Sequence, residues 1–199
     1  MLGNGSHVIF HKQDISIRYL DYQYLKEMVN IFNEHHIEYV LDTDTYCYLK
    51  ESCTSLIEFY SHCHIDFENL CFQYNEEEVL KRVIKVEIWV KDQNELEIVK
   101  DASQHFICEV HPDSHSVEIY AKDVSKATGI NDVLNTLNIP LKHSYCFGDG
   151  PNDIEMFDTV GHPIAMDNAI DMIKSKAEII CPSVKEDGVA IQLRKIFIE

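Results

Sequence analysis

The spacing of hydrophobic residues predicts several short helices and strands in the first 121 residues. Asp21 can cap a helix in which leucine, methionine, valine and phenylalanine recur three or four positions apart. Apolar and charged residues alternate over residues 84–90, which is the period of a half-buried strand. The other elements expected here are strands over 37–41, 106–110 and 116–121, helices over 54–63 and 94–104, and a turn at Pro112-Asp113. This irregular order is typical of an α+β domain.

Helices and strands alternate regularly after Lys122. The expected elements are helices over 126–137, 152–159, 169–176 and 188–197, and strands over 143–147, 163–166 and 178–181. Regular alternation of this kind is typical of a parallel sheet with crossover helices. The sequence therefore predicts an α/β protein in two domains, with an α+β domain over 1–121 and a parallel-sheet domain over 122–199.

The charge balance argues against some classes of partner. The 199-residue chain has 17 lysines and arginines against 34 aspartates and glutamates, a formal net charge of -17. A surface this acidic repels nucleic-acid backbones and anionic membranes. No stretch of the sequence approaches the ~20 apolar residues of a membrane span, and its opening lacks the features of a secretory signal. We expect a cytoplasmic protein with neither a nucleic-acid nor a membrane partner.

Cysteines and histidines raise the alternative of a zinc-binding module. The seven cysteines contain no CxxC pair, and without an export signal we expect them to be reduced thiols. The histidines that could join a metal site are His62 and His64, on either side of Cys63, and the pair His111 and His115. Neither group has the spacing of a known zinc motif, so zinc binding is kept as an alternative only.

Residues 145–153 carry the clearest chemical pattern. A short apolar strand ends in Gly148-Asp149-Gly150 and leads into a helix expected to start at Asn152-Asp153. The two carboxylates are then expected at the carboxyl end of a parallel strand, where open α/β sheets bind ligands. Oxygen ligands of this kind suit Mg²⁺. The structural alternative is a turn whose aspartates cap the helix and whose glycines permit a positive φ.

Lys126 is expected at the start of the helix that precedes this strand. A lysine at the same sheet edge can neutralise a phosphoryl group, which is the second requirement of metal-assisted phosphoryl transfer. The alternative is a solvated surface lysine. The segments 165–169 and 186–190 also place polar residues at helix starts, where N–H groups can meet an anion.

Four sequence motifs follow one another over about 75 residues: SKATGINDVLNTLNIP, FGDGPNDIEMF, GHPIAMDNA and KEDGVA. In order and spacing they resemble the carboxyl-terminal core of the haloacid dehalogenase (HAD) superfamily, and within it the Cof-type phosphatases. Residues 3–120 are similar to that family's α+β cap domain. The resemblance implies a partial HAD-like (Rossmannoid) core with a cap, and Mg²⁺-dependent hydrolysis of sugar phosphates or similar small phosphorylated metabolites.

The resemblance also implies roles for single residues. Lys126 would stabilise the phosphorylated nucleophile as a catalytic residue, and Asn152 would contact the phosphate region. Asp149 would ligate Mg²⁺, and Asp153 would support the metal site. The chain departs from the family where Ala127 and Asp167 stand at positions that are commonly glycine.

The family's nucleophile motif, Asp-x-Asp at the end of a first strand, has no clear counterpart here. The chain is similar to family members from just after that region, so we expect a truncated core. The one candidate replacement is Asp42, in Asp42-Thr43-Asp44-Thr45 after the apolar run 37–41. A strand ending in alternate carboxylates is what a phosphoryl-accepting aspartate needs, but Tyr46 and Cys47 replace the expected small residue and turn.

Two functions follow from this combination. The first is a Cof-type phosphatase-like hydrolase that is weakly active or inactive alone, with self-association or a partner chain completing the core sheet. The second is a non-catalytic protein that uses the same residues to bind a phosphorylated metabolite or a protein.

Overall fold

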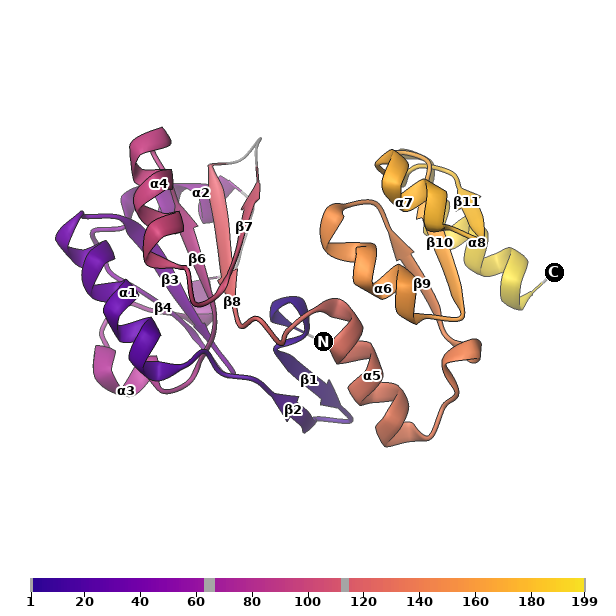
Figure 1. The fold of residues 1–199 in the computed structure, drawn as a ribbon, viewed down its shortest axis with the longest axis horizontal. Helices are drawn as coiled ribbons and strands as arrows, with labels where there is room; N and C mark the ends of the chain where they lie inside the picture. Colours follow the sequence, from indigo (N-terminus) through magenta and orange to yellow (C-terminus); the bar gives the residue numbers. More distant parts are fainter. Residues whose placement is uncertain (1, 63–66, 112–114, 199) are drawn as a thin grey trace. The chain divides into compact units, whose positions relative to one another are not determined.

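The computed structural model describes residues 2–62, 67–111 and 115–198, and the chain divides into two compact units (Figure 1). The first comprises Met1–His7 and Ser16–Val124, and the second Val8–Ile15 and Ser125–Glu199. The division after Val124 lies close to the boundary predicted after residue 121, whereas Val8–Ile15 group with the second unit. The α+β arrangement expected from the sequence occurs in the first unit and the parallel sheet in the second.

The first unit is built on a six-stranded sheet. In spatial order its strands are β5 (Leu70–Cys71), β4 (Cys47–Leu49), β3 (Glu38–Thr43), β6 (Val83–Trp89), β8 (Ser116–Tyr120) and β7 (Ile107–His111). Its helices are α1 (Tyr22–Glu34), α2 (Thr54–His62), α3 (Glu76–Leu80) and α4 (Gln93–Ala102). Neighbouring strands are antiparallel except for β4 and β5, which are parallel.

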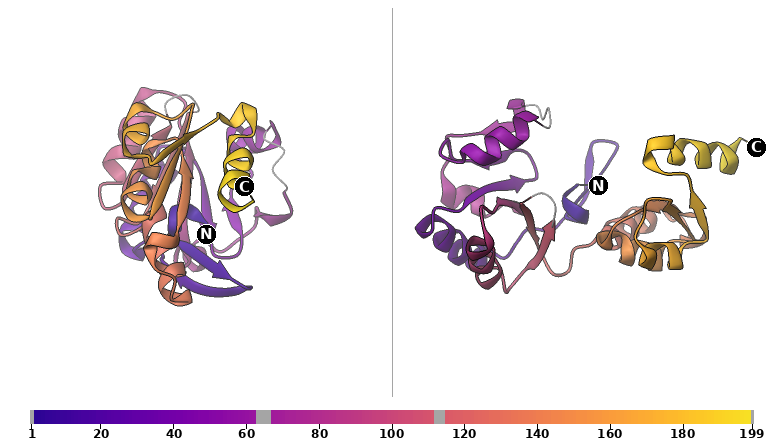
Figure 2. Two further views of the ribbon diagram at one scale, coloured as in Figure 1. Left: turned by 90° about the vertical axis from the view of Figure 1, so that its right-hand side faces the viewer. Right: turned by 90° about the horizontal axis from the view of Figure 1, so that it is seen from above.

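The two faces of this sheet have different covers. Along β6 the side chains of Ile84, Val86 and Ile88 are buried, while the intervening Lys85, Glu87 and Trp89 are half-buried. The fully apolar face packs against α1, α3 and α4 to form the main core. The other face is covered in part by α2, through a smaller cluster that includes Leu56 (Figure 2).

Side chains at the helix starts explain where these helices begin. Asp21 accepts hydrogen bonds from the backbone N–H groups of Gln23 and Tyr24, which confirms it as the cap of α1. The cap of α2 comes from the neighbouring strand, because Glu38 accepts from the N–H groups of Ser55 and Leu56, at 2.8 and 3.1 Å. Helix α2 is therefore fixed to β3 at its amino end.

The second unit contains a three-stranded parallel sheet in the order β11 (Ile179–Cys181), β10 (His162–Met166), β9 (Tyr145–Gly148). Its helices are α5 (Lys126–Leu137), α6 (Ile154–Thr159), α7 (Asp171–Lys176) and α8 (Gly188–Phe197). Helices α5, α6 and α7 lie on one side of the sheet and α8 on the other (Figure 2). The core between them includes Phe157, Ile164 and Ile173.

The boundaries on both sides of β9 differ from the sequence-based expectation. The strand begins at Tyr145 rather than residue 143, because Leu141–His143 form a short 3₁₀ turn. The helix expected from residue 152 is preceded by a second 3₁₀ turn, Pro151–Asp153, and α6 proper begins at Ile154. Proline occupies the first position of that turn, where its fixed φ and missing N–H suit a helix start.

A hairpin that the sequence did not predict precedes α1. Strands β1 (His7–Phe10) and β2 (Gln13–Ile17) are joined by His11 and Lys12, which both have positive φ, 50° and 64°. Two residues of positive φ form the tight turn that suits the twist of a hairpin, but asparagine and glycine normally occupy it. The hairpin thus lacks its usual sequence signal.

No helix within the described residues has the length and apolar character needed to cross a bilayer. The described cysteines, Cys47, Cys53, Cys71, Cys108, Cys146 and Cys181, are all free thiols.

Candidate functional site

The turn that follows β9 brings the sequence-predicted site residues of the second unit together. Gly148 ends the strand, and a Cβ atom there would lie 2.7 Å from Oδ2 of Asp153 and 2.7 Å from the ring of Phe157. That spacing is too short for any side chain, so glycine is required at this position. The absence of a side chain lets the carboxylate of Asp153 fold back under the turn.

Asp153 is the buried organiser of this turn. Its Oδ2 accepts hydrogen bonds from the backbone N–H groups of Asp149, at 2.9 Å, and Gly150, at 3.2 Å. Its Oδ1 pairs with Nζ of Lys126 at 2.5 Å. The side chain of Asp153 is 5% exposed and that of Lys126 27% exposed, so the lysine reaches from solvent into the turn. One carboxylate therefore connects the start of α5 to the end of β9.

Lys126 stands at the start of α5, where a local motif fixes the helix. Ser125 caps it by accepting from the N–H of Thr128, and Thr128 accepts from the N–H of Ser125 in return. This reciprocal cap sets the point at which the helix begins. The first residue after it is Lys126, whose ammonium group is thereby directed toward Asp153.

Asp149 is exposed and makes a contact that the sequence reasoning did not identify. Its Oδ2 accepts a hydrogen bond from Nδ2 of Asn168 at 3.1 Å, and Oδ1 of Asn168 accepts from the N–H of Val184 at 3.2 Å. Asn168 follows β10, so it joins the ends of two strands to the segment before α8. The pattern of polar residues at 165–169 was the available signal, although it did not single out this side chain.

The donors at this turn fit Mg²⁺ at one of the two predicted carboxylates. Asp149 presents an exposed carboxylate at the carboxyl end of a parallel strand, which is the oxygen donor that Mg²⁺ prefers. Both oxygens of Asp153 already have partners, in Lys126 and in two backbone N–H groups. The arrangement therefore suits a metal held by Asp149, with Asp153 supporting it through the turn.

The remaining sequence-predicted residues flank this turn. Asn152 is half-buried in the turn Pro151–Asp153, and its role toward a phosphate stays a prediction. Asp167, one of the departures from the family pattern, is 69% exposed and lies 4.0 Å from the ammonium group of Lys174. Solvent and this lysine both screen its charge.

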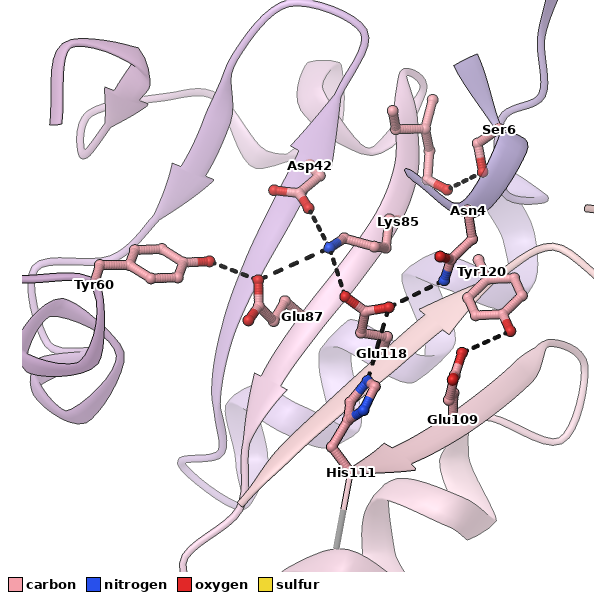
Figure 3. A network of polar contacts seen from close by, with 11 residues as sticks. Asn4, Ser6, Asp42, Tyr60, Lys85, Glu87, Glu109, His111, Glu118 and Tyr120 are labelled. Carbon is pink, nitrogen blue, oxygen red and sulfur yellow. Dashed lines mark hydrogen bonds and ion pairs between the residues drawn. The ribbon is translucent and has the colours of Figure 1, made fainter. Parts of the chain in front are cut away.

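Asp42, the candidate replacement nucleophile, lies in the first unit. It is on β3, opposite Cys47 of β4 in an antiparallel pair, and it faces Lys85 of β6. Its Oδ2 is 3.3 Å from Nζ of Lys85 (Figure 3). A nucleophilic role for Asp42 stays a hypothesis.

Lys85 is the centre of a cluster of carboxylates on the partly covered sheet face (Figure 3). Its Nζ lies 2.9 Å from Glu118, 3.3 Å from Asp42 and 3.9 Å from Glu87. Burial by itself would lower the pKa of Lys85, but the three carboxylates raise it, so the ammonium group stays charged. Burial raises the pKa of Glu87, although Lys85 and the hydroxyl of Tyr60 act against it.

The histidines considered for zinc have separate partners. Nδ1 of His62 is 2.8 Å from the backbone oxygen of Glu58, while Cys63 and His64 lie outside the described residues. His115 stacks on Trp89, and its Nδ1 is 3.0 Å from the backbone oxygen of Val90. His111 instead lies beside Glu118.

The family model described as haloacid dehalogenase-like hydrolase matches residues 1–193. The chain belongs to the haloacid dehalogenase-like hydrolase family. This result confirms the family predicted from the four motifs, and the match includes the first unit as well as the parallel-sheet unit.

Curated relatives of this hydrolase family match shorter stretches of the chain. A 5-amino-6-(5-phospho-D-ribitylamino)uracil phosphatase of Bacillus subtilis, YwtE, is 33% identical over 101 residues, which are 50% of this chain and 35% of the relative. Another B. subtilis protein with the same activity in its name, YitU, is 35% identical over 83 residues, 42% of this chain and 31% of the relative. The matched stretches thus span about a third of each relative.

Solved structures share the fold over nearly the whole chain. A Thermotoga maritima protein superimposes with a TM-score of 0.81 at 20% identity, over 98% of this chain and 74% of its own. A structure described as a HAD subclass IIB sugar phosphatase has a TM-score of 0.76 at 20% identity, over 98% of this chain and 73% of its own. At this identity the likeness establishes the fold.

Proposed function

We propose that this chain carries the metal- and phosphate-binding side of a Mg²⁺-dependent phosphomonoester hydrolase that acts on small phosphorylated metabolites, such as sugar phosphates. The observation that carries the proposal is the turn after β9, where the buried carboxylate of Asp153 pairs with Lys126 and accepts from the N–H of Asp149, whose own carboxylate is exposed. Family membership and the phosphatase activities named for the relatives support the same reading.

Each residue has a distinct part in this proposal. Lys126 would neutralise phosphoryl oxygens, and its position is fixed by Asp153 and by the cap of α5. Asp149 would hold Mg²⁺ in an orientation set by Asn168. When bound, the metal would supply positive charge to the phosphoryl group. Asn152 would contribute an amide donor from the same turn.

Turnover also needs a nucleophile, and in the described part of the second unit the carboxylate that pairs with Lys126 is that of Asp153. Asp153 is engaged by three donors, and Asp149 is the metal ligand in this proposal. We therefore propose that the 199-residue chain alone hydrolyses phosphomonoesters slowly or not at all. In the first unit, Asp42 is the residue to test as a substitute.

Binding and turnover are tested separately. Titration calorimetry of the full chain with Mg²⁺, and then with inorganic phosphate, should give saturable binding that falls at least tenfold in Lys126→Ala and Asp149→Asn. Lys142→Ala and Asp171→Asn are matched controls, since both residues are exposed in the same unit. Binding that is equal in all five proteins, or absent in all, would count against the proposal.

Hydrolysis of an aryl phosphate in the presence of Mg²⁺ tests the nucleophile. We expect at most a slow rate from the unsubstituted chain. A measurable rate that is lost in Lys126→Ala, Asp149→Asn and Asp42→Asn would identify Asp42 as the nucleophile. Activity that survives both Asp42→Asn and Asp44→Asn would refute the inactivity proposal.

A non-catalytic binding role is the second candidate. It is favoured by the same geometry, because Lys126 and Asp149 are in place to hold a phosphorylated ligand, whereas Asp153, the carboxylate paired with Lys126, is already engaged by three donors. Saturable phosphate binding without turnover, in samples whose folding is verified, would support this role.

The edge of the parallel sheet suggests a partner for this unit. Strand β9 pairs only with β10 among the described strands, so one side of Tyr145–Gly148 offers backbone donors and acceptors. We propose that self-association or a partner chain covers this edge. Sedimentation equilibrium should then show dimers or larger species at micromolar concentration, and a strict monomer would exclude self-association.

A further inference from the structure

The sheet of the first unit carries a second cluster of charged side chains, in which carboxyl groups outnumber the one lysine. Glu87 on β6, Glu118 on β8 and Glu109 on β7 form a row, because the register pairs Glu87 with Glu118 and Glu118 with Glu109. Like charges directly opposite one another on neighbouring strands are destabilising. Three carboxyl groups, those of Asp42, Glu87 and Glu118, share Lys85 as their lysine partner, whereas Glu109 accepts a hydrogen bond from the hydroxyl of Tyr120.

Lys85 serves only one end of this row. It approaches Oε1 of Glu118, on the side nearer to Asp42 and Glu87. The other oxygen, Oε2, accepts from Nδ2 of Asn4 at 3.0 Å and lies 3.9 Å from Nε2 of His111. Glu118 thus lies between a lysine and a histidine (Figure 3).

Glu109 closes the other side of a three-residue group. Glu109 is two positions before His111 on β7, so both side chains lie on the same face of the sheet. Glu118 of β8 is directly opposite Glu109. Donor atoms of Glu109, His111 and Glu118 all lie within 4.8 Å of one another. The register of two paired strands, rather than a loop, produces this convergence.

We propose that Glu109, His111 and Glu118 form a binding site for a divalent transition-metal ion, with Zn²⁺ as the best match. One imidazole nitrogen and two carboxylate oxygens are ligands that Zn²⁺ accepts, and water can complete the coordination because all three side chains are half-buried. Bonds of about 2.0–2.2 Å would place donors roughly 3.4 Å apart. Small side-chain rotations from the present spacing reach that geometry.

Hydrogen bonds from neighbouring side chains hold the two proposed carboxylate ligands in position. The hydroxyl of Tyr120 donates to Oε2 of Glu109 at 2.9 Å, and Asn4 and Lys85 hold the two oxygens of Glu118. Hydrogen-bonded carboxylates of this kind are already positioned, which lowers the cost of ordering them around an ion. The bound cation would also reduce the repulsion between Glu109 and Glu118.

The first test is calorimetric titration of the full-length chain with Zn²⁺, after removal of metals with a chelator. We expect the unsubstituted chain to bind one Zn²⁺ more than Glu109→Gln and His111→Gln, or to bind it at least tenfold more tightly. Glu109→Gln retains an oxygen acceptor for the hydroxyl of Tyr120, so it preserves the local packing. His115→Gln is the matched control for the loss of a histidine. Asp149→Asn removes the proposed Mg²⁺ ligand of the second unit, so it tests whether that residue contributes to Zn²⁺ binding.

A second measurement needs no substitution and separates this site from the cysteines. Co²⁺ bound at this site should give an absorption spectrum without a thiolate charge-transfer band and should selectively broaden the NMR signals of the His111 ring. Equal Zn²⁺ binding by the unsubstituted chain, Glu109→Gln and His111→Gln would overturn the proposal. So would a His111 signal unaffected by Co²⁺. Either result leaves the proposed phosphate site untouched, because its residues are not varied in those proteins.

Discussion

Asp153 joins Lys126 to the turn after β9 through a 2.5 Å ion pair in which the carboxylate is almost fully buried. Its second oxygen holds two backbone N–H groups, so the same side chain stabilises two elements of the parallel-sheet unit. This pairing has energetic consequences that can be measured apart from any reaction.

Replacing Asp153 should destabilise the protein more than replacing its partner. Asp153→Ala leaves two N–H groups and the lysine without their acceptor and should lower the free energy of unfolding by about 3 kcal/mol. Lys126→Met leaves the carboxylate with its two N–H donors and should cost about 1–2 kcal/mol. Urea denaturation followed by circular dichroism measures both.

The exposed pair of Lys176 and Asp158 is the control for this comparison. Its atoms are also close, at 2.6 Å, but both side chains are at least one-third exposed. Lys176→Met should therefore change stability by no more than about 0.5 kcal/mol. A loss as large as that of Lys126→Met would show that burial does not set the strength of these pairs.

Residues that usually occupy a turn of this kind should stabilise the β1–β2 hairpin. His11 and Lys12 both adopt positive φ, which disfavours side chains with a Cβ. The double variant His11→Asn, Lys12→Gly should stabilise the hairpin by roughly 1–2 kcal/mol. Amide hydrogen exchange of β1 and β2 reports this directly. Lys12→Ala keeps the strain and should bring no gain, so equal protection in the two variants would contradict the argument.

Cys146 should be an unreactive thiol at neutral pH. Burial raises its pKa to about 11, and the charge of Asp153 adds to this effect, while a hydrogen bond to the backbone of Ile164 opposes it. At pH 8 roughly one thiol in a thousand is then ionised. Alkylation followed by mass spectrometry should modify Cys146 only slowly until urea unfolds the chain. Modification at the same rate in the folded and unfolded protein would refute this.

Asp44 should contribute stability that disappears in acid. Burial would raise its pKa, but the hydrogen bond and charge of Arg82, 2.6 Å away, hold the pKa below its ordinary value. The contribution is therefore present above about pH 4 and is lost as the pH falls through the folded pKa. At pH 7 Asp44→Asn should cost about 1 kcal/mol, because half-exposed Arg82 is screened by solvent.

The pH profile of this variant distinguishes the charge from the packing. The difference in stability between the parent and Asp44→Asn should shrink steadily below pH 4, as measured by thermal unfolding. Asp123→Asn removes an exposed carboxylate and should leave the profile unchanged. A constant difference down to pH 2 would mean that the side chain acts through its shape alone.

The sequence predicted those parts of the fold that depend on local periodicity. The Asp21 cap gave the start of α1, the alternation over 84–90 placed β6 to within one residue, and α8 over 188–197 was correct at both ends. The β1–β2 hairpin was missed because His11-Lys12 carries no turn signal. Strands β4 and β5 were missed because they are only three and two residues long.

The residues of the candidate sites also fall into two groups, those that local sequence predicts and those that only the fold brings together. Lys126, Asp149 and Asp153 were predicted because they occur in contiguous motifs next to a strand end. Asn168 and the row Glu87, Glu118, Glu109 were not, because their partners are set by the order and register of strands distant in sequence. Only the folded sheet brings those residues together.

The alternation along β6 places residues needed for folding and residues available for binding on opposite faces of one strand. Val86 and Ile88 face the main core, and a polar substitution at either should lower the amount of folded protein in a cell. Lys85 and Glu87 project to the partly covered face, where charge can change while the core persists. Over residues 85–88, mutational tolerance should therefore be higher at the two odd-numbered positions than at the two even-numbered ones, which leaves the charged positions open to divergence in what the face binds.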